Sequence, residues 1–231
     1  MNIVYNSWLI DFELQQFRDL LYVLSTSLKD FEQKLEDWYT ADDLENMDEE
    51  KQNQYERYID IYQSVLGDFP RRIYSGFVVS WYSFVEDALC QLCTDLNITV
   101  SLRFQDQVGL GSGLQRAKRF LAETGQIDVE KEDWLELEHI RKIRNQIVHK
   151  GGKFPCSIEK PDNNVQTILY SEGETSYYIT IDKELYGYLE RNSLQRFYGT
   201  LFINPSLEYC QSLVSFGQRF FSWILSDLKL I

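Results

Sequence analysis

The sequence predicts a mainly α-helical protein with one small β-hairpin. Long segments carry apolar residues every three or four positions, which is the spacing of helices with one buried face. One segment instead alternates β-branched and tyrosine residues around a turn-like SEGE. With 44% apolar and 15% aromatic residues, the 231-residue chain can bury a sizeable core. We therefore expect a single domain, residues 1–231, built as a helical bundle.

The N-terminal segment predicts a long helix over residues 8–39. Its apolar residues are spaced alternately four and three positions apart, the heptad pattern of a helix that packs along its whole length. They are Ile10, Leu14, Phe17, Leu21, Leu24, Leu28, Phe31, Leu35 and Trp38. This seam has two interpretations: packing within the chain's own bundle, or a coiled-coil contact with a second copy.

A helical core is expected over residues 50–150. The acidic and polar stretch 40–54 is interpreted as a loop that leads into a helix, and Gly67 and Pro70 end that helix. A long apolar helix then follows, and a short helix precedes the last helix of the core.

The long apolar helix is expected over residues 71–96, and two acidic residues, Glu86 and Asp87, lie near its middle. The short helix is expected over 112–123. After Pro161 the pattern changes, and a hairpin is expected over 163–182.

The helical period returns in the C-terminal segment 183–230, where two helices are expected. The second starts after Pro205 and has a broad apolar face. That face comprises Leu213, Phe216, Phe220, Phe221, Ile224 and Leu228.

The formal net charge of −13 excludes a protein that coats nucleic acid through many Lys and Arg contacts, so a nucleic-acid site must be local. No run of 18 apolar residues occurs, and no N-terminal signal sequence with a basic segment followed by an apolar one, which predicts a soluble cytoplasmic protein with no membrane segment.

Cys90 and Cys93 lie in an apolar helical run without a second ligand pair, and they are interpreted as buried thiols. No metal or other cofactor is expected.

The last helix of the core begins between residues 128 and 132, ends at Gly151 and Gly152, and carries Arg144 in the middle of its apolar face. The apolar residues within about 100° of this arginine are Trp134, Leu137, Ile140, Ile143, Ile147 and Val148. A guanidinium in apolar surroundings needs a partner, because its desolvation is costly. The partner is either a carboxylate across the bundle, from Glu86 or Asp87, or an anion received in a cleft.

Polar and basic residues border the same face. Asn145 and His149 are four residues apart and share one side of the helix, with Arg141 one turn earlier. Residues 141–158 contain no acid and five bases, namely Arg141, Lys142, Arg144, Lys150 and Lys153. In an acidic chain this is a local anion-attracting patch. Arg144 and His149 are about 140° apart on a regular helix, so either the last turn unwinds at the glycines or a second copy completes the site.

Arg144-Asn145, three residues and then His149 resembles the signature of the HEPN superfamily, an arginine, a polar residue and a histidine after four to six intervening positions. The order of the expected helices up to the motif is also similar: a long helix pair, a helix with a central acid in SFVEDAL, a short helix and the motif helix. The resemblance covers about Pro70 to Lys153. The resemblance implies a HEPN-like, typically dimeric helical bundle in which the hairpin and the C-terminal helices are subfamily additions.

Many members of this superfamily are metal-independent ribonucleases of toxin–antitoxin and phage-defence systems. The resemblance therefore implies an endoribonuclease that cleaves RNA by 2′-hydroxyl attack and leaves a 2′,3′-cyclic phosphate, with Arg144, Asn145 and His149 as catalytic residues. RNA-binding or supporting roles are expected for Arg141, Lys142, Lys150, Lys153 and Glu86. The implied partners are RNA, a second copy that forms a composite active site, and an antitoxin similar to small nucleotidyltransferases.

A second function stays open: a non-catalytic helical dimer of the same fold that binds a protein, a nucleotide or RNA and uses Arg144 in a structural ion pair. His149 is then a helix C-terminal residue, favoured there as a cation by the helix dipole. His139 lies roughly 80° from His149 around the axis and is expected on the surface without a partner. The nuclease hypothesis requires Arg144 in a phosphate-accessible pocket near the imidazole of His149, from its own subunit or a symmetry-related one.

Overall fold

A computed structural model of the chain describes residues 3–38, 49–64, 68–97, 112–123, 127–161, 167–173 and 175–228. Within these ranges the protein is mainly α-helical, as predicted, with seven helices and six short strands. The helices are α1 (Ile3–Trp38), α2 (Glu49–Gln63), α3 (Phe69–Asn97), α4 (Gly113–Glu123), α5 (Glu132–Lys150), α6 (Lys183–Arg191) and α7 (Leu207–Asp227). The strands are β1 (Lys153–Phe154), β2 (Cys156–Ser157), β3 (Thr167–Glu172), β4 (Thr175–Thr180), β5 (Gln195–Phe197) and β6 (Leu201–Ile203).

The strands form two antiparallel sheets of three strands each, in the orders β1-β6-β5 and β2-β4-β3. The expected hairpin is present as β3 and β4, which pair from Thr167 opposite Thr180 to Glu172 opposite Thr175. The other four strands are absent from the sequence prediction, because each has only two or three residues and shows no readable alternation. Residues 40–48 of the acidic loop predicted over 40–54 lie outside the described residues, and residues 49–54 belong to α2, so the loop prediction is wrong for that part.

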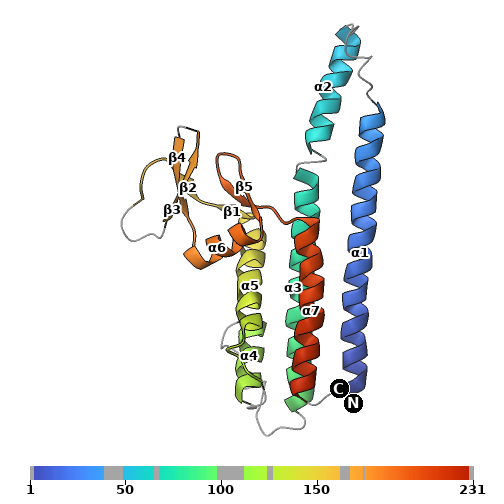
Figure 1. The fold of residues 1–231 in the computed structure, drawn as a ribbon, viewed down its shortest axis with the longest axis vertical. Helices are drawn as coiled ribbons and strands as arrows, with labels where there is room; N and C mark the ends of the chain where they lie inside the picture. The colour runs from blue at the N-terminus through green and yellow to red at the C-terminus, as the bar shows by residue number, and fades with distance from the viewer. Residues whose placement is uncertain are drawn as a thin grey trace.

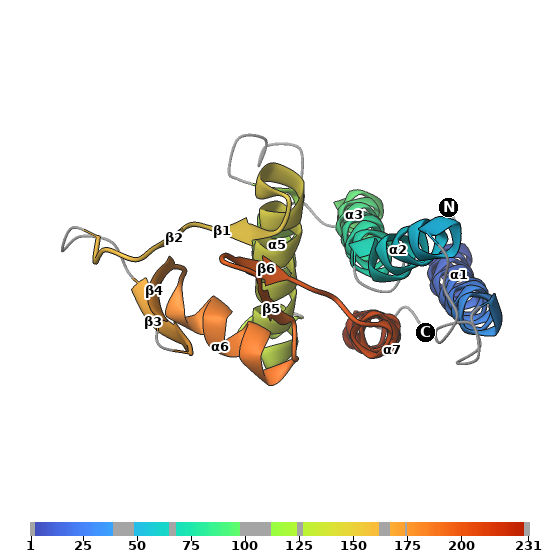
Figure 2. The same cartoon turned by 90° about the horizontal axis from the view of Figure 1, so that it is seen from above.

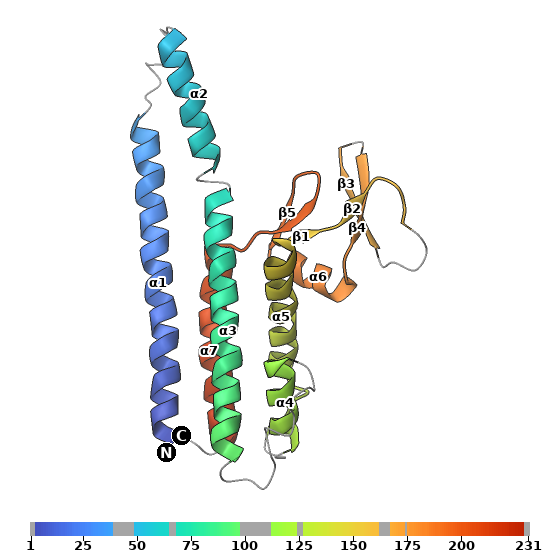
Figure 3. The same ribbon diagram turned by 180° about the vertical axis from the view of Figure 1, so that it is seen from behind.

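Three long helices, α1, α3 and α7, lie side by side and pack against one another (Figure 1). Helix α5 lies on the other side of α3, together with α4, as the view from behind also shows (Figure 3). The two sheets and α6 gather at the C-terminal end of α5. Seen from above, α1 and the sheets stand on opposite sides of the molecule (Figure 2). The C-terminal end of α5 is therefore the place where the helical bundle and the strands meet.

The predicted N-terminal helix is present as α1, and its seam packs against α7 and α3 of the same chain. The buried or core-contacting members of the seam are Ile10, Leu14, Phe17, Leu21 and Leu28. Phe31 is exposed, and the side chains of Leu35 and Trp38 lie outside the described residues. The first half of the seam thus serves the chain's own bundle.

Gly217 of α7 lies close to side chains of both α1 and α3. A Cβ atom there would lie 3.0 Å from Leu14 Cδ2 and 3.2 Å from Trp81 Cζ2. Trp81 is fully buried, and its ring centroid lies 6.1 Å from that of Phe216. The indole therefore fills the space among α1, α3 and α7, at the centre of the core.

Helix α5 is attached to α7 at its N-terminal end. Trp134 packs edge-on against Phe220 with ring centroids 5.1 Å apart, and Arg219 Nη2 donates to Asp133 Oδ1 at 3.1 Å. The buried members of the predicted apolar face are Trp134, Leu137, Ile140 and Ile143. Val148, at the end of that face, is exposed. The apolar face is therefore buried as predicted up to Ile143, and Ile147 is partly buried against the core.

His139 of α5 is buried, so the expectation of a surface residue is wrong. Its imidazole is 6% exposed and stacks on the Tyr188 ring of α6 with centroids 4.6 Å apart. The Tyr188 hydroxyl donates to Glu136 Oε1 and lies 3.3 Å from the Tyr209 hydroxyl. This cluster joins α6 to α5 and α7. A helical wheel of α5 could not reveal it, because the stacking partner is distant in the sequence.

We expect buried His139 to make the protein less stable in mild acid. Burial lowers the pKa of its imidazole below 6.5, the value of a free side chain; Lys142 and Arg191 lower it further, whereas Glu136 and Glu184 raise it. The unfolded chain therefore binds a proton near pH 6.5 that the folded protein binds only at lower pH. The contribution of His139 to the free energy of unfolding is full above that pH and decreases as the pH falls towards the folded-state pKa.

Urea unfolding midpoints measured from about pH 7.5 to about pH 5 test this expectation. His139→Phe keeps an aromatic ring on Tyr188 but has no titratable nitrogen, so its midpoint should fall less in acid than that of the wild type. The other of the two histidines, His149, is exposed, and His149→Ala is the matched control that should keep the wild-type slope. Equal slopes for the wild type and His139→Phe would contradict the expectation.

Candidate functional site

Helix α5 stays regular through Lys150 and stops at two glycines. Both glycines are in the left-handed region, with φ of 60° at Gly151 and 76° at Gly152. The Gly152 N–H donates to the Gln146 carbonyl at 3.0 Å, which closes the helix end, and the Gly152 carbonyl accepts the Ile203 N–H at 2.8 Å, which leads into the β1–β6 pair. The last turn therefore does not unwind ahead of the glycines. The prediction that unwinding of the last turn brings Arg144 and His149, about 140° apart on a regular helix, to the same side is therefore wrong.

The last turns of α5 form one wall of an open pocket of about 490 Å³. Strand β1 contributes to it, and the end of β4 and the start of α6 form the opposite wall; Figures 1 and 2 show α6 against this half of α5. The lining residues are Lys142, Asn145, Gln146, His149, Lys150, Phe154, Thr180, Ile181, Asp182 and Leu185. Four predicted site residues thus share one pocket: Asn145, His149, Lys142 and Lys150. His149 is exposed, so a ligand can reach its imidazole.

Positive charge dominates the lining of this pocket. Its two ammonium groups come from Lys142 and Lys150, and Asp182 is the one acid among the lining residues. Asp182 Oδ1 accepts the Leu185 N–H at 2.9 Å and Lys142 Nζ at 3.3 Å. The backbone hydrogen bond from Leu185, followed by Lys142, lowers the pKa of Asp182. The Asp182 carboxylate thus caps the N-terminus of α6 and pairs with Lys142. Lys150 and His149 are left to contact an anionic ligand.

Arg144 lies half-buried on the inner side of the same wall, between α5 and α3. Its Nη1 donates to Asn145 Oδ1 at 2.9 Å, and its guanidinium carbon lies 6.0 Å from the centroid of the Tyr82 ring. Its Nε is buried and has no hydrogen-bond partner within the described ranges. Arg144 is not among the residues that line the pocket. The requirement that Arg144 itself lie in the pocket with His149 is therefore not met within one chain, and Arg144 is connected to the pocket only through Asn145.

This contact fixes the orientation of the Asn145 amide. A guanidinium only donates hydrogen bonds, so the atom of Asn145 that faces Arg144 has to be the carbonyl oxygen. The amide nitrogen, with two N–H donors, is left for the pocket that Asn145 lines. Arg144 thus makes Asn145 a hydrogen-bond donor towards an anion, and its own charge adds to the positive potential of the wall.

An ion pair of Arg144 with Glu86 or Asp87 is not found in the part of the chain that the structure describes. Glu86 Oε1 instead accepts the Leu114 N–H at 3.0 Å, at the N-terminus of α4, where the helix dipole favours a negative charge. Gly113 permits this approach, since a Cβ atom there would lie 2.9 Å from Glu86 Cγ. Glu86 therefore caps α4, and no ion pair joins it to the Arg144 guanidinium within the described ranges.

Besides Arg144 and Glu86, two more predicted site residues, Arg141 and Lys153, lie outside the pocket. Arg141 Nε donates to Glu138 Oε2 at 2.7 Å, so its charge is paired within α5. Lys153 is exposed, whereas its neighbour Phe154 is buried and lines the pocket. Because successive side chains of a strand alternate, Lys153 points to the opposite face of the β1-β6-β5 sheet.

Sequence reasoning misses three polar residues of the pocket, Gln146, Thr180 and Asp182. Gln146 follows Asn145 directly and could have been found on the same helical wheel. Its side-chain amide donates to the Lys153 carbonyl and ties the helix end to β1. Thr180 and Asp182 reach the pocket only because β4 folds back towards α5. The local signal for Asp182 is its position as N-cap of a helix that begins at Lys183.

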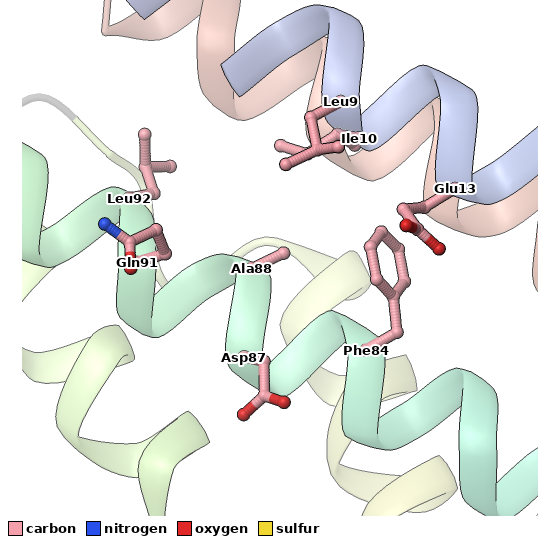
Figure 4. A pocket seen from close by; sticks show the side chains of 8 residues that line it. All are labelled: Leu9, Ile10, Glu13, Phe84, Asp87, Ala88, Gln91 and Leu92. Atoms are coloured by element: carbon pink, nitrogen blue, oxygen red, sulfur yellow. The ribbon is translucent and has the colours of Figure 1, made fainter. Parts of the chain in front are cut away.

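A second hollow, of about 450 Å³, lies between α1 and α3 (Figure 4). It is lined by Leu9, Ile10, Glu13, Phe84, Asp87, Ala88, Gln91 and Leu92. Its charged lining residues, Glu13 and Asp87, are both acids. Since these carboxylates repel a phosphate, the pocket at the end of α5 is the better candidate for an anionic ligand.

Within the described ranges, no three His, Cys, Asp or Glu side chains are placed to hold a metal ion. Cys93 is buried, as predicted, and Cys90 is half-buried; burial raises the pKa of the Cys93 thiol.

Among the helices that the structure describes, none has the length and the apolar character needed to span a bilayer.

Comparisons with models of protein families, with curated proteins and with solved structures give no match to the chain. What the pocket binds must therefore follow from its own side chains. Those are an exposed imidazole, an oriented amide and two ammonium groups at the end of one helix.

Proposed function

We propose that the protein is a metal-independent endoribonuclease of the cytoplasm, acting in a toxin–antitoxin or phage-defence system. The observation that carries the proposal is that His149, Asn145, Lys142 and Lys150 line one open pocket. An imidazole titrates near neutral pH and moves protons, while ammonium and amide groups bind phosphate oxygens. The resemblance of Arg144-Asn145 and His149 to the HEPN signature supports the same chemistry.

In the proposed reaction His149 acts as the base. It takes the proton of a ribose 2′-hydroxyl, and the 2′ oxygen attacks the adjacent phosphorus. A bond forms between the 2′ oxygen and phosphorus, the bond from phosphorus to the 5′ oxygen breaks, and a 2′,3′-cyclic phosphate results. The Asn145 amide and Lys150 bind the non-bridging oxygens as their negative charge grows. Arg144 positions Asn145 and adds positive potential.

The leaving 5′ oxygen has to receive a proton. We propose that a second copy of the chain supplies it, so that one His149 is the base and its twin is the acid. His149 and Lys150 are exposed at the end of α5, where a two-fold related copy has access to them. By resemblance to the same superfamily, a nucleotidyltransferase-like antitoxin is the proposed neutralising partner.

Incubation of the purified protein with total RNA in the presence of EDTA tests the proposed function. We expect cleavage to persist in EDTA, because no step needs a metal. The fragments should end in 2′,3′-cyclic phosphates, which mass spectrometry identifies. Intact RNA after incubation with the folded wild type would contradict the proposal.

Exposed apolar residues on α1 favour a second candidate, a non-catalytic module that holds a protein partner. Trp8 and Phe12 stack with ring centroids 5.3 Å apart, and both are about half exposed, as are Leu20 and Val23. Large exposed apolar patches mark interaction sites. This candidate is favoured if the wild type leaves RNA intact and Phe12→Ser abolishes capture of a partner from the native host.

A further inference from the structure

Cations and aromatic rings alternate across the outer face of the β1-β6-β5 sheet. Lys153 of β1 is paired with Phe202 of β6, and Phe202 is paired with Arg196 of β5. Residues directly opposite each other in neighbouring strands have side chains on the same face. The three side chains therefore form one row across the sheet, on the face opposite to buried Phe154 and Leu201.

Two further residues complete this surface. Arg71, near the start of α3, places its guanidinium carbon 5.2 Å from the Phe202 ring centroid, and Lys153 Nζ lies 5.4 Å from the same centroid. The guanidinium carbon of Arg196 lies 4.7 Å from the centroid of the Tyr198 ring, which is 62% exposed. These five residues, Arg71, Lys153, Arg196, Tyr198 and Phe202, are called the cation–aromatic face.

The cation–aromatic face is locally positive in a chain whose net charge is −13. Asp68 is the acid beside it, 3.5 Å from Arg71, and lines a small hollow with Arg71, Arg196, Tyr198 and Phe202. Neither Lys153 nor Arg196 forms an ion pair with any residue that the structure describes. Because charges are screened beyond about 8–10 Å at physiological salt, this local excess governs what binds here, and the distant acids matter less.

An acidic polypeptide and a nucleic acid are two partners that would supply negative charge. Aromatic rings next to cations favour the second. In sites for single-stranded nucleic acid, bases stack on exposed rings while Lys and Arg hold the phosphates. Tyr198 offers an exposed ring with Arg196 beside it, and Lys153 and Arg71 flank the other ring. An acidic peptide has no planar bases and leaves Tyr198 without a stacking partner.

The face lies close to the pocket at the end of α5. Lys153 is four residues beyond His149, and its carbonyl accepts the side-chain amide of Gln146, which lines the pocket. Strand β1 separates the two surfaces: Phe154 faces the pocket and Lys153 faces outward. A strand of RNA that crosses β1 can therefore contact both.

We propose that the cation–aromatic face binds single-stranded RNA and holds the nucleotides that flank the cleaved phosphate. The proposal rests on the proposed function for the identity of the ligand, but it concerns binding alone. A short, fluorescently labelled 2′-O-methyl RNA tests it, because that strand has no free 2′-hydroxyl and cannot be cleaved by the proposed reaction. Binding and cleavage are then measured separately.

We expect Lys153→Ala/Arg196→Ala to weaken binding of this RNA by about tenfold or more at moderate salt. The slope of log affinity against log salt should become shallower by about 1.4, since each phosphate contact to a single strand contributes about 0.7. Tyr198→Ala should also weaken binding by about tenfold through loss of stacking, and Tyr198→Phe should restore it. Lys29→Ala/Lys34→Ala, which removes two exposed cations from α1, is the matched control and should bind like the wild type.

Wild-type affinity in the Lys153→Ala/Arg196→Ala variant, or an equal loss in the α1 control, would overturn the proposal. Polyglutamate that binds as tightly as the RNA and competes with it would also overturn it, in favour of an acidic protein partner. Thermal unfolding checks that each variant is folded. If the wild type binds the 2′-O-methyl strand through this face but leaves natural RNA intact, the nuclease proposal fails and the binding site stands. If the wild type cleaves natural RNA but the variants of the cation–aromatic face bind the 2′-O-methyl strand normally, the binding proposal fails and the nuclease proposal stands.

Discussion

His149→Ala is expected to reduce RNA cleavage by about 10²–10⁴-fold, the usual contribution of a general base or acid, while the thermal midpoint stays unchanged. The side chain is exposed at the end of α5, so its removal leaves no cavity and breaks no buried contact. Initial rates on a defined single-stranded RNA measure the effect. His139→Phe, which alters the other histidine outside the pocket, is the control and should cleave at nearly the wild-type rate around pH 7.5. Equal rates for His149→Ala and the wild type would rule out the proposed base.

The role of Arg144 can be separated from that of Asn145 by a double-mutant cycle. If Arg144 acts by orienting the Asn145 amide, Arg144→Ala and Asn145→Ala each lower the cleavage rate, and the double variant is little slower than the slower single variant. Additive losses would instead indicate that Arg144 contacts the phosphate directly, as the sequence predicts.

Mixed dimers of wild-type and His149→Ala protomers test whether a second copy of the chain supplies the acid. Full activity of mixed dimers would contradict a base and an acid from different chains.

Trp81→Ala is expected to lower the free energy of unfolding by about 3–5 kcal/mol, since truncation of a buried Trp leaves a cavity. Trp81 of α3 is 0% exposed and lies beside Gly217 of α7, which is also close to Leu14 of α1. For a chain of this length the loss corresponds to a thermal midpoint lower by about 6–20 °C. Scanning calorimetry or circular dichroism measures the shift.

Trp8→Ala supplies the matched control for this core variant. The same atoms are removed, but the Trp8 side chain is 56% exposed on α1, so the midpoint should change far less. Similar shifts for the two variants would mean that the centre of the long-helix core lies elsewhere.

The helices of this protein are readable from local sequence. The four-three spacing from Ile10 to Leu28 predicts the buried side of α1, and the apolar period from Trp134 to Ile143 predicts the buried side of α5. Two glycines after Lys150 predict its left-handed end. The same wheel places Asn145 and His149 on one side, and both line the pocket. These features follow from spacing within one element, because a helix repeats every 3.6 residues wherever it packs.

The partners of these residues were decided by the tertiary structure. Sequence alone could not show that Glu86 accepts the Leu114 N–H, because that contact depends on where α4 lies against α3. The burial of His139 depends on α6 folding back onto α5, and so do the opposite wall of the pocket and the pairing of Asp182 with Lys142. Periodicity states which side of an element is apolar; it carries no information on which distant segment covers that side. Contacts between distant segments are selected by packing, hydrogen bonding and charge acting together in the folded chain.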